Sequence, residues 1–319
     1  MLNIEGEDMQ HVTIDDFAHS FGTTVEDFPN ECLKMIRGKD FRYRRFDKKE
    51  RDNIILQVLK KIEGDTQIIG ATERKDVWEH GWAENLQSFV ESGGDLDTLI
   101  PKFIRENQPI RYAGDYIMPA NQRFEYDFMT VFRLWLFRKY LSPFDTIYEF
   151  GCGTGMNLVL LASLFPEKEF HGLDFVQSSV ELINKIGESN AGTIRGRLFD
   201  MIEPDESLQL SQNSAVFTFG AIEQLADKFE KFIQFLLHNK PRLCIHIEPT
   251  IELYDEDDLF DYLAIKFHRK RGYTENLLPY LQELERRGAI RLIKVKRLYL
   301  GSLFMEGYTY YIWEPLLKE

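Results

Sequence analysis

Apolar residues in the first hundred positions recur at helical spacing. Ile54, Val58 and Ile62 form one apolar stripe, with Asp47 in front of the segment and Gly64 at its end. Such spacing places side chains on one face of a helix, and Asp and Gly are typical of its two ends. We therefore expect a helix between these two residues.

The next fifty residues change from a helical pattern to an irregular one. Trp78, Trp82, Leu86 and Phe89 recur at intervals of three or four, which predicts an amphipathic helix with its aromatic side facing inward. The following stretch, 105–128, contains two prolines, a glycine and several aromatic residues. That composition predicts an ordered, lid-like loop more than a regular element.

After residue 128 the pattern changes again, because short apolar runs alternate with stretches long enough for helices. This alternation is typical of a parallel sheet covered by helices on both faces. The connection between the last two runs is too short for a parallel crossover, so these strands are expected to pair antiparallel. The expected strands are 146–150, 169–173, 194–199, 214–219, 242–247, 289–299 and 307–313.

These patterns predict two regions: a helical N-terminal region, 1–128, that ends in the lid-like loop, and an α/β domain, 129–319. The 319 residues include 52 acidic and 39 basic side chains, giving a formal charge of −13, and 44% are hydrophobic. This is the composition of a globular protein, and its negative charge disfavours binding to nucleic acid or a membrane surface.

No leader peptide and no membrane span is predicted from the sequence. The three cysteines, Cys32, Cys152 and Cys244, are far apart and match neither a disulfide framework nor a zinc site. We expect a cytoplasmic protein that needs no metal.

The strongest chemical signal is the run EFGCGTG at the end of the first expected strand, with Glu149, Gly151, Gly153 and Gly155. Glycines permit a tight turn and let a ligand approach the backbone. The run is not a dinucleotide fingerprint, because Met156 stands where that pattern needs a glycine, and no Lys-Ser or Lys-Thr of a phosphate-binding loop follows.

This ExGxGxG pattern resembles class I S-adenosylmethionine-dependent methyltransferases. The resemblance implies a Rossmann-like seven-stranded, mostly parallel sheet with an antiparallel last strand, beside the helical N-terminal region, and S-adenosyl-L-methionine as the cofactor. It implies that Glu149 and the glycine turn hold the methionyl end of the cofactor, which carries an ammonium and a sulfonium. The helix with GWAENL is similar to methyltransferases of bacterial surface-glycan clusters, which implies a sugar acceptor.

The resemblance also implies roles at the next three strand ends. Asp174 would accept hydrogen bonds from the ribose hydroxyls, and Phe175 would face the adenine ring. Asp200 would accept from the adenine amino group, with Met201 against the ring, and Phe219 would contact the cofactor where the substrate pocket begins. A tight turn that binds no ligand is the alternative, but it does not explain acids at three successive strand ends.

Methyl transfer to a hydroxyl also requires removal of a proton. Ligands in open α/β sheets bind at the carboxyl ends of strands, so candidate bases are expected there. His246 and Glu248 share one side of the fifth strand, and Glu223 follows the fourth. The ordinary pKa of histidine suits a base, whereas the alternative for His246 is a place in the core.

In many family members the segment before the glycine motif folds over the cofactor, and Tyr116 and Arg123 are candidates for that role. Arg123 could bind the carboxylate of the cofactor or of an acidic substrate. The alternative is that this loop only packs the N-terminal helices onto the sheet. The basic run 268–271 is likewise either a solvated face or a site for an acidic group of the acceptor.

Three functions remain open. The first is O-methylation of a small molecule, such as a sugar or a related hydroxyl or acidic acceptor. The second is N-methylation of an amine or peptide, and the third is a cofactor-binding partner subunit without catalysis. Methylation of nucleic-acid bases is disfavoured, because FGAIEQ stands where that group has NPPY or DPPY. Neither the acceptor nor the oligomeric state follows from the sequence.

Overall fold

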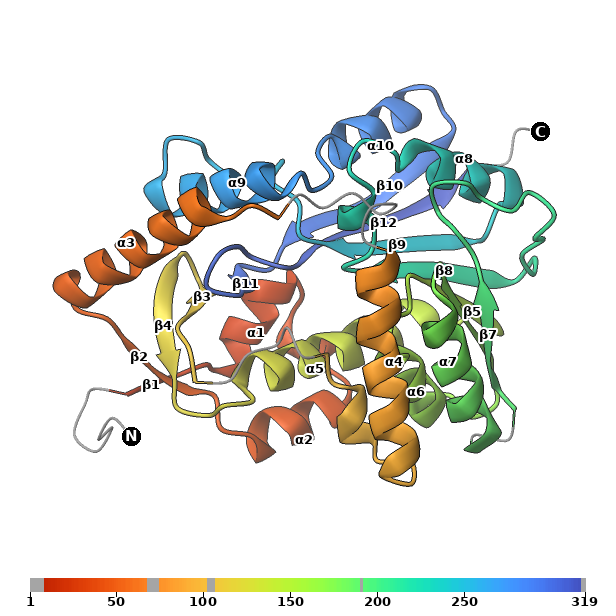
Figure 1. Ribbon diagram of the computed structural model, residues 1–319, viewed down its shortest axis with the longest axis horizontal. Helices are drawn as coiled ribbons and strands as arrows, with labels where there is room; N and C mark the ends of the chain where they lie inside the picture. The colour runs from red at the N-terminus through yellow and green to blue at the C-terminus, as the bar shows by residue number, and fades with distance from the viewer. Residues whose placement is uncertain (1–8, 68–74, 102–106, 190–191, 317–319) are drawn as a thin grey trace.

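The chain forms a seven-stranded sheet with helices on both faces and a smaller sheet beside it (Figure 1). The computed structural model describes residues 9–67, 75–101, 107–189 and 192–316. The strands of the large sheet are β5 (Thr146–Phe150), β6 (Glu169–Asp174), β7 (Ile194–Leu198), β8 (Ser214–Phe219), β9 (Leu243–Glu248), β10 (Ile290–Arg297) and β12 (Thr309–Pro315).

The strand order in the large sheet is β10-β12-β9-β8-β5-β6-β7. β5 to β9 pair in parallel, whereas β12 pairs antiparallel with both β9 and β10. The prediction of a Rossmann-like, mostly parallel sheet with an antiparallel last strand is therefore confirmed. The order changes direction at β5, so the end of this strand lies at a switch point of the sheet, where open α/β sheets bind ligands.

Alternate residues of the strands contribute to two apolar cores. On β9, Ile245 and Ile247 face the first core, and Cys244 faces the second. The first core is closed by α5 (Phe124–Leu136), α6 (Met156–Leu164) and α7 (Gln177–Ser189), and the second by α8 (Glu230–Asn239) and α10 (Leu277–Arg286). Two short helices, η3 (Phe137–Leu141) and η4 (Ile222–Leu225), follow α5 and β8.

The N-terminal part contains the predicted helices and, in addition, strands. Its helices are α1 (Ile14–Phe21), η1 (Val25–Asp27), α2 (Asn30–Gly38), α3 (Lys48–Gly64), α4 (Lys75–Glu91) and η2 (Leu96–Leu99). Asp47 caps α3, because its side chain accepts a hydrogen bond from the backbone N–H of Glu50, as the sequence predicts for this end. The prediction for both long helices is confirmed.

A second, antiparallel sheet joins the N-terminal part to the large sheet. Its order is β1 (Gln10–His11), β2 (Arg42–Arg45), β4 (Asp115–Pro119), β3 (Ile110–Tyr112) and β11 (Leu300–Gly301). The stretch predicted as an irregular loop is thus partly a hairpin of β3 and β4. Ala113 and Gly114 connect the two strands with positive φ angles of 50° and 80°, the conformation of a tight hairpin turn.

The chain leaves the large sheet after β10, adds β11 to the small sheet, and returns to β12 through residues 302–308. α9 (Leu259–Arg271) packs against α3 and shares an apolar cluster with Tyr116 and Met305. The predicted boundary after residue 128 falls inside α5, so the separation into two domains stays a prediction. Among the described residues, no helix combines the length and apolar character that crossing a bilayer requires.

Candidate functional site

Two adjoining cavities lie at the carboxyl ends of β5, β6, β7 and β8. The larger has a volume of about 400 Å³ and the smaller of about 70 Å³. Trp78, Trp82, Gly151, Gly220 and Gln224 line both, so the cavities meet between the glycine turn and the turn after β8.

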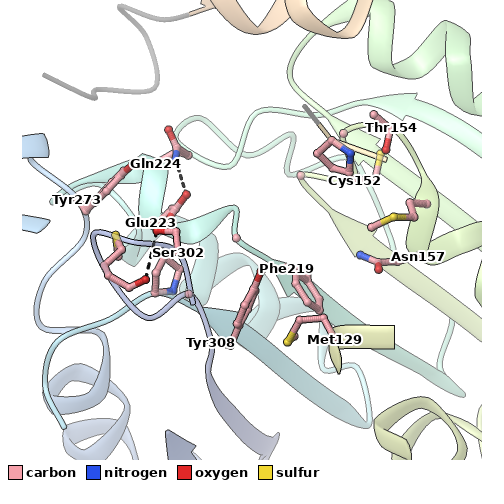
Figure 2. A pocket seen from close by; sticks show the side chains of 18 of the residues that line it. Met129, Cys152, Thr154, Asn157, Phe219, Glu223, Gln224, Tyr273, Ser302 and Tyr308 are labelled. Carbon is pink, nitrogen blue, oxygen red and sulfur yellow. Dashed lines mark hydrogen bonds between the residues drawn. The ribbon is translucent and has the colours of Figure 1, made fainter. Parts of the chain in front are cut away.

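The larger cavity is elongated, and its lining comes from distant parts of the chain. Figure 2 shows Cys152, Thr154 and Asn157 on one side, Tyr273, Ser302, Glu223 and Gln224 on the other, and Phe219, Tyr308 and Met129 between them. We call the part lined by Glu149, Cys152 and Asn157 the glycine-turn end. The far end is the part lined by Pro249, Phe267, Arg271, Tyr273, Phe304 and Met305.

The glycine turn has a conformation that requires glycine. Gly151, Gly153 and Gly155 have φ angles of 69°, 52° and 75°, in the left-handed region that other residues rarely adopt. A Cβ on Gly151 would lie only 2.4 Å from the Cβ of Ala221. Gly151 and Gly153 line the larger cavity, whereas Gly155 precedes α6 and packs against Ile183.

The smaller cavity collects four of the predicted site residues. Asp174 and Phe175 at the end of β6 line it together with Asp200 and Met201, which follow β7. The parallel pairing of β5, β6 and β7 brings these strand ends to one edge of the sheet. Gly151 completes this wall from the glycine turn.

Asp174 lines the smaller cavity and supports the glycine turn, which lines the larger one. Its Oδ2 accepts a hydrogen bond from the N–H of Gly153 at 2.9 Å, and its Oδ1 accepts one from the N–H of Val176 at 3.3 Å. Burial raises the pKa of Asp174 to about 6, against the lowering effect of these backbone donors. A carboxylate accepts more than two hydrogen bonds, so capacity remains for a ligand hydroxyl.

Glu149 lies at the glycine-turn end in a buried polar network. Its Oε1 accepts a hydrogen bond from Asn157 Nδ2 at 2.6 Å, and Asn157 Oδ1 accepts one from Arg133 Nη1 at 3.3 Å. Its Oε2 is buried and has no hydrogen-bond partner among the described residues. Burial raises the pKa of Glu149 to about 8, which means that the site disfavours the charged carboxylate until a cation balances it.

One face of α5 runs along the larger cavity. Glu125, Met129 and Arg133 are spaced four residues apart, and all three line it. Tyr308 donates a hydrogen bond from its hydroxyl to Glu125 Oε1 at 3.3 Å, and burial raises the pKa of Glu125 to about 7. The helix therefore presents an acid near the middle of the cavity and a guanidinium near Glu149.

The structure does not bring His246 to either cavity, which corrects its prediction as the base. Its ring lies in the second core against Phe232 and Trp313, with Nδ1 3.0 Å from Thr218 Oγ1. Burial lowers its pKa to about 3. The physical reason is strand alternation, because a side chain inside a strand points to a face of the sheet, and α8 covers this face.

Glu248 is also buried, behind the turn that follows β8. It accepts hydrogen bonds from the hydroxyl of Thr218 at 2.6 Å and from the N–H groups of Ala221 and Glu223. Burial raises its pKa to about 7. Glu248 therefore supports the turn, and of the three predicted bases Glu223 alone lines the larger cavity.

Tyr116 and Arg123, predicted to fold over the cofactor, do not line these cavities. Tyr116 is buried against Phe260, and Arg123 pairs with Asp97 at 3.5 Å and lies over the ring of Tyr126. The alternative fits better: the aromatic residues around them pack the N-terminal helices onto the sheet.

α4 covers the cavities instead. Trp78 and Trp82 stack with ring centroids 5.3 Å apart, and Trp82 lies close to Gly153. Glu79 fastens the helix, because its carboxylate accepts hydrogen bonds from the N–H groups of Gln177 and Ser178 at 2.8 and 2.9 Å. These donors belong to the first turn of α7, where backbone N–H groups lack partners within the helix.

The basic run 268–271 divides between the cavity and the surface. Arg271 lines the far end, but its Nε donates to Asp65 and its Nη1 to Gln67, both at 2.6 Å. Arg269 forms ion pairs with Glu256 and Glu275 on the surface. His268 is buried, and burial lowers its pKa to about 4.

Sequence reasoning missed several polar residues of the larger cavity, namely Glu125, Arg133, Asn157 and Tyr308. A signal was available for two of them, because Glu125 and Arg133 are charged positions on a mainly apolar helix. Tyr308 had none, since its partner lies 183 positions away. Among the described residues, no group of three or more His, Cys, Asp or Glu side chains could hold a metal ion.

Comparison with known proteins gives matches to solved structures. No protein-family model matches the chain, and no curated protein matches it. The methyltransferase domain of bacterial CtHen1-C is 17% identical, with a TM-score of 0.42 over 57% of this chain and 94% of that one. Geranyl diphosphate C-methyltransferase from Streptomyces coelicolor A3(2) is 11% identical, with a TM-score of 0.42 over 62% and 85%. A SAM-dependent methyltransferase from Aquifex aeolicus is 16% identical, with a TM-score of 0.38 over 56% and 89%.

Proposed function

We propose that this protein is an S-adenosyl-L-methionine-dependent methyltransferase that methylates a hydroxyl group of a small molecule. One observation carries the proposal: three acids at successive strand ends, Glu149, Asp174 and Asp200, converge on two adjoining cavities around one glycine turn. The cofactor offers a matching set of groups, since it has an ammonium, two ribose hydroxyls and an adenine amino group that all donate hydrogen bonds.

The residues at the glycine-turn end fit the methionyl part of this cofactor. The buried Oε2 of Glu149 has no partner in the part of the chain that the structure describes, and an ammonium would supply both a hydrogen bond and the balancing charge. Arg133 is a buried guanidinium joined to Glu149 through Asn157, which suits a carboxylate. In the smaller cavity, Asp174 and Asp200 would accept from the ribose and the adenine, between Phe175 and Met201.

When bound, the cofactor would supply a methyl group on a positively charged sulfur. Transfer of this methyl group to the acceptor oxygen would release S-adenosylhomocysteine, and the proton of the acceptor hydroxyl would pass to a base of the protein. The protein must therefore align the acceptor, exclude water and accept a proton. The stacked rings of Trp78 and Trp82, on α4, line both cavities and shield them from water. Glu125 and Glu223 are the carboxylates beyond Phe219 that could take the proton.

The binding of S-adenosylhomocysteine tests the cofactor assignment. We expect this compound to raise the melting temperature, because a ligand that binds the folded state stabilises it. Asp174→Ala should abolish the rise, whereas Asp257→Ala, which removes an exposed aspartate from the loop before α9, should keep it. Absence of a rise in the unaltered protein would overturn the proposal.

Methyl transfer itself is tested separately. The protein is incubated with the labelled cofactor and a cell extract, and the extract is searched by mass spectrometry for molecules that gain one methyl group. A methylated hydroxyl supports the proposal, and a methylated amine replaces O-methylation by N-methylation. Cofactor binding without any methylated product indicates a partner subunit that binds the cofactor without catalysis.

A further inference from the structure

We propose that the far end of the larger cavity binds the flat aromatic body of a neutral phenol, and that Glu125 and Tyr308 hold its hydroxyl group. This inference rests on the proposed function, because it names the acceptor class of that site.

The walls beyond the glycine turn are mainly aromatic and apolar. Phe267 and Phe304 stack with centroids 5.0 Å apart and ring planes 18° apart, and Phe219 lies 5.8 Å from Tyr308. Pro249 and Met305 complete this part of the lining. Such a surface gains free energy from apolar area removed from water, and aromatic side chains favour contact with another ring.

A sugar is a poor match for these walls. Each sugar hydroxyl that leaves water needs a hydrogen-bond partner, and a buried polar group without one costs about 1–3 kcal/mol. Phe267 and Phe304 offer no such partner, and the polar groups around the far end, on Arg271, Tyr273 and Ser302, are few for an acceptor that carries several hydroxyls. The surface-glycan acceptor implied by the sequence resemblance is therefore not favoured.

The charges at this end disfavour an anionic acceptor. Among the described residues, Arg271 is the cation that lines the far end. Its guanidinium already donates hydrogen bonds to the buried carboxylate of Asp65 and to Gln67. Glu125 and Glu223 border the same space. A phosphate or carboxylate would meet two acids and a guanidinium that is already neutralised, so a neutral acceptor fits better.

The middle of the cavity offers one polar anchor beside the aromatic rings. Glu125 accepts a hydrogen bond from Tyr308, and a carboxylate has capacity for further donors, such as a phenolic hydroxyl. The raised pKa of Glu125, about 7 through burial, is close to the value that suits proton transfer near neutral pH. An acceptor whose ring lies between the far-end walls would place its hydroxyl at this anchor, towards the glycine turn.

Ligand binding to the protein saturated with S-adenosylhomocysteine tests the inference. The probes are 1-naphthol and 7-hydroxycoumarin as phenols, 1-methoxynaphthalene as a ring without a donor, and glucose 1-phosphate and benzoate as anions, measured by isothermal titration calorimetry. We expect both phenols to bind, 1-methoxynaphthalene to bind about tenfold more weakly, and both anions not to bind. Binding of an anion, or no binding by either phenol, would overturn the inference.

Three variants locate the phenol. Phe304→Ala should weaken binding of 1-naphthol by about tenfold, the loss expected for one aromatic contact. Tyr262→Ala removes an exposed ring on α9 and should leave the affinity unchanged. Glu125→Gln should weaken 1-naphthol but not 1-methoxynaphthalene, because the latter has no hydroxyl to donate. Equal affinities for 1-naphthol in Phe304→Ala and Tyr262→Ala would contradict the placement.

The two proposals fail in different ways. A protein that binds S-adenosylhomocysteine but no phenol keeps the proposed function and loses the acceptor class. If the protein does not bind S-adenosylhomocysteine, the proposed function is lost, and the same phenol titrations on the ligand-free protein then show whether the far end keeps its ligand.

Discussion

The two ends of the larger cavity are built in different ways. The glycine-turn end comes from residues 149–157 and neighbouring strand ends, and short hydrogen bonds such as Gly153 N–H to Asp174 hold it. The far end combines α9, residues 302–308 and the turn after β9, which buried ion pairs hold together. A substitution can therefore weaken one end without the other. The two ends also differ in how many of their residues can be predicted from the sequence.

Arg297 is the centre of the ion pairs behind the far end. It lies at the end of β10, with ion pairs to Asp261 of α9 and to Glu306 of the 302–308 segment, and all three residues are buried. Replacing Arg297 by Met leaves Glu306 without its cation and leaves Asp261 with only the more distant Arg111, 3.9 Å away. We expect the free energy of unfolding in urea to fall by about 3–5 kcal/mol.

The control for this change is Arg286→Met, since Arg286 pairs with Glu283 on the surface. A surface ion pair contributes about 0–1 kcal/mol, so this variant should be nearly as stable as the unaltered protein. Equal losses in the two variants would show that the buried ion pairs do not hold the far end.

Asp174 is the corresponding support of the glycine-turn end. Asp174→Asn keeps the shape of the side chain but replaces one acceptor oxygen by a donor, so we expect affinity for S-adenosylhomocysteine to fall by about tenfold to a hundredfold. Isothermal titration measures this change. The affinity for 1-naphthol should change less. An equal loss of affinity for both ligands would show that the two ends of the cavity are not independent.

Glu149 should make stability depend on pH. Burial raises its pKa in the folded protein to about 8, above the ordinary value of 4.5, so the folded state holds a proton that the unfolded chain releases. Its contribution to stability is therefore present at low pH and lost as pH rises through about 8. We expect the melting temperature of the ligand-free protein to fall between pH 5 and pH 8.

Glu149→Gln removes this titration, so the fall should become smaller in that variant. Glu125 and Glu248, whose pKa values burial raises to about 7, and Asp174, whose pKa burial raises to about 6, also contribute to the fall with the same sign. A melting curve of Glu149→Gln that follows the unaltered protein at every pH would contradict the raised pKa.

Glu79 should produce the smallest effect. Glu79→Ala removes the two acceptors for the N–H groups of Gln177 and Ser178, a loss of about 1 kcal/mol for a helix cap. Because α4 covers the two cavities to which we assign the cofactor in our proposal, affinity for S-adenosylhomocysteine should fall by about fivefold. Glu84→Ala, on the same helix, serves as the control, and faster amide exchange in α4 of the Glu79 variant alone would support the capping role.

Much of the fold was predictable because its signals are local. The helix α3 begins after Asp47 and ends at Gly64, as the apolar stripe and its flanking residues predict. Each strand of the large sheet begins and ends within two residues of its predicted bounds. The reason is that buried strands are short apolar runs between turns. The hairpin of β3 and β4 was missed, because aromatic residues and prolines in that stretch resemble those of a loop.

The candidate site divides in the same way. Asp174, Phe175, Asp200 and Met201 line one cavity, as expected for residues that follow parallel strands. His246 was assigned wrongly, because the sequence shows which residues share a side of β9 but not which helix covers that side. Arg123 was predicted to face the cofactor, whereas Arg133, inside a mainly apolar helix, was missed although it lines the larger cavity.

The sequence by itself determined the secondary structure of the α/β part, the strand-end acids and the glycine turn, because these depend on neighbours along the chain and on regular strand pairing. The tertiary structure alone decided which groups share the larger cavity. Glu125 meets Tyr308 across 183 positions, and Arg271 meets Asp65 across 206. Such contacts follow from how helices and loops pack on the sheet, and no local pattern encodes them.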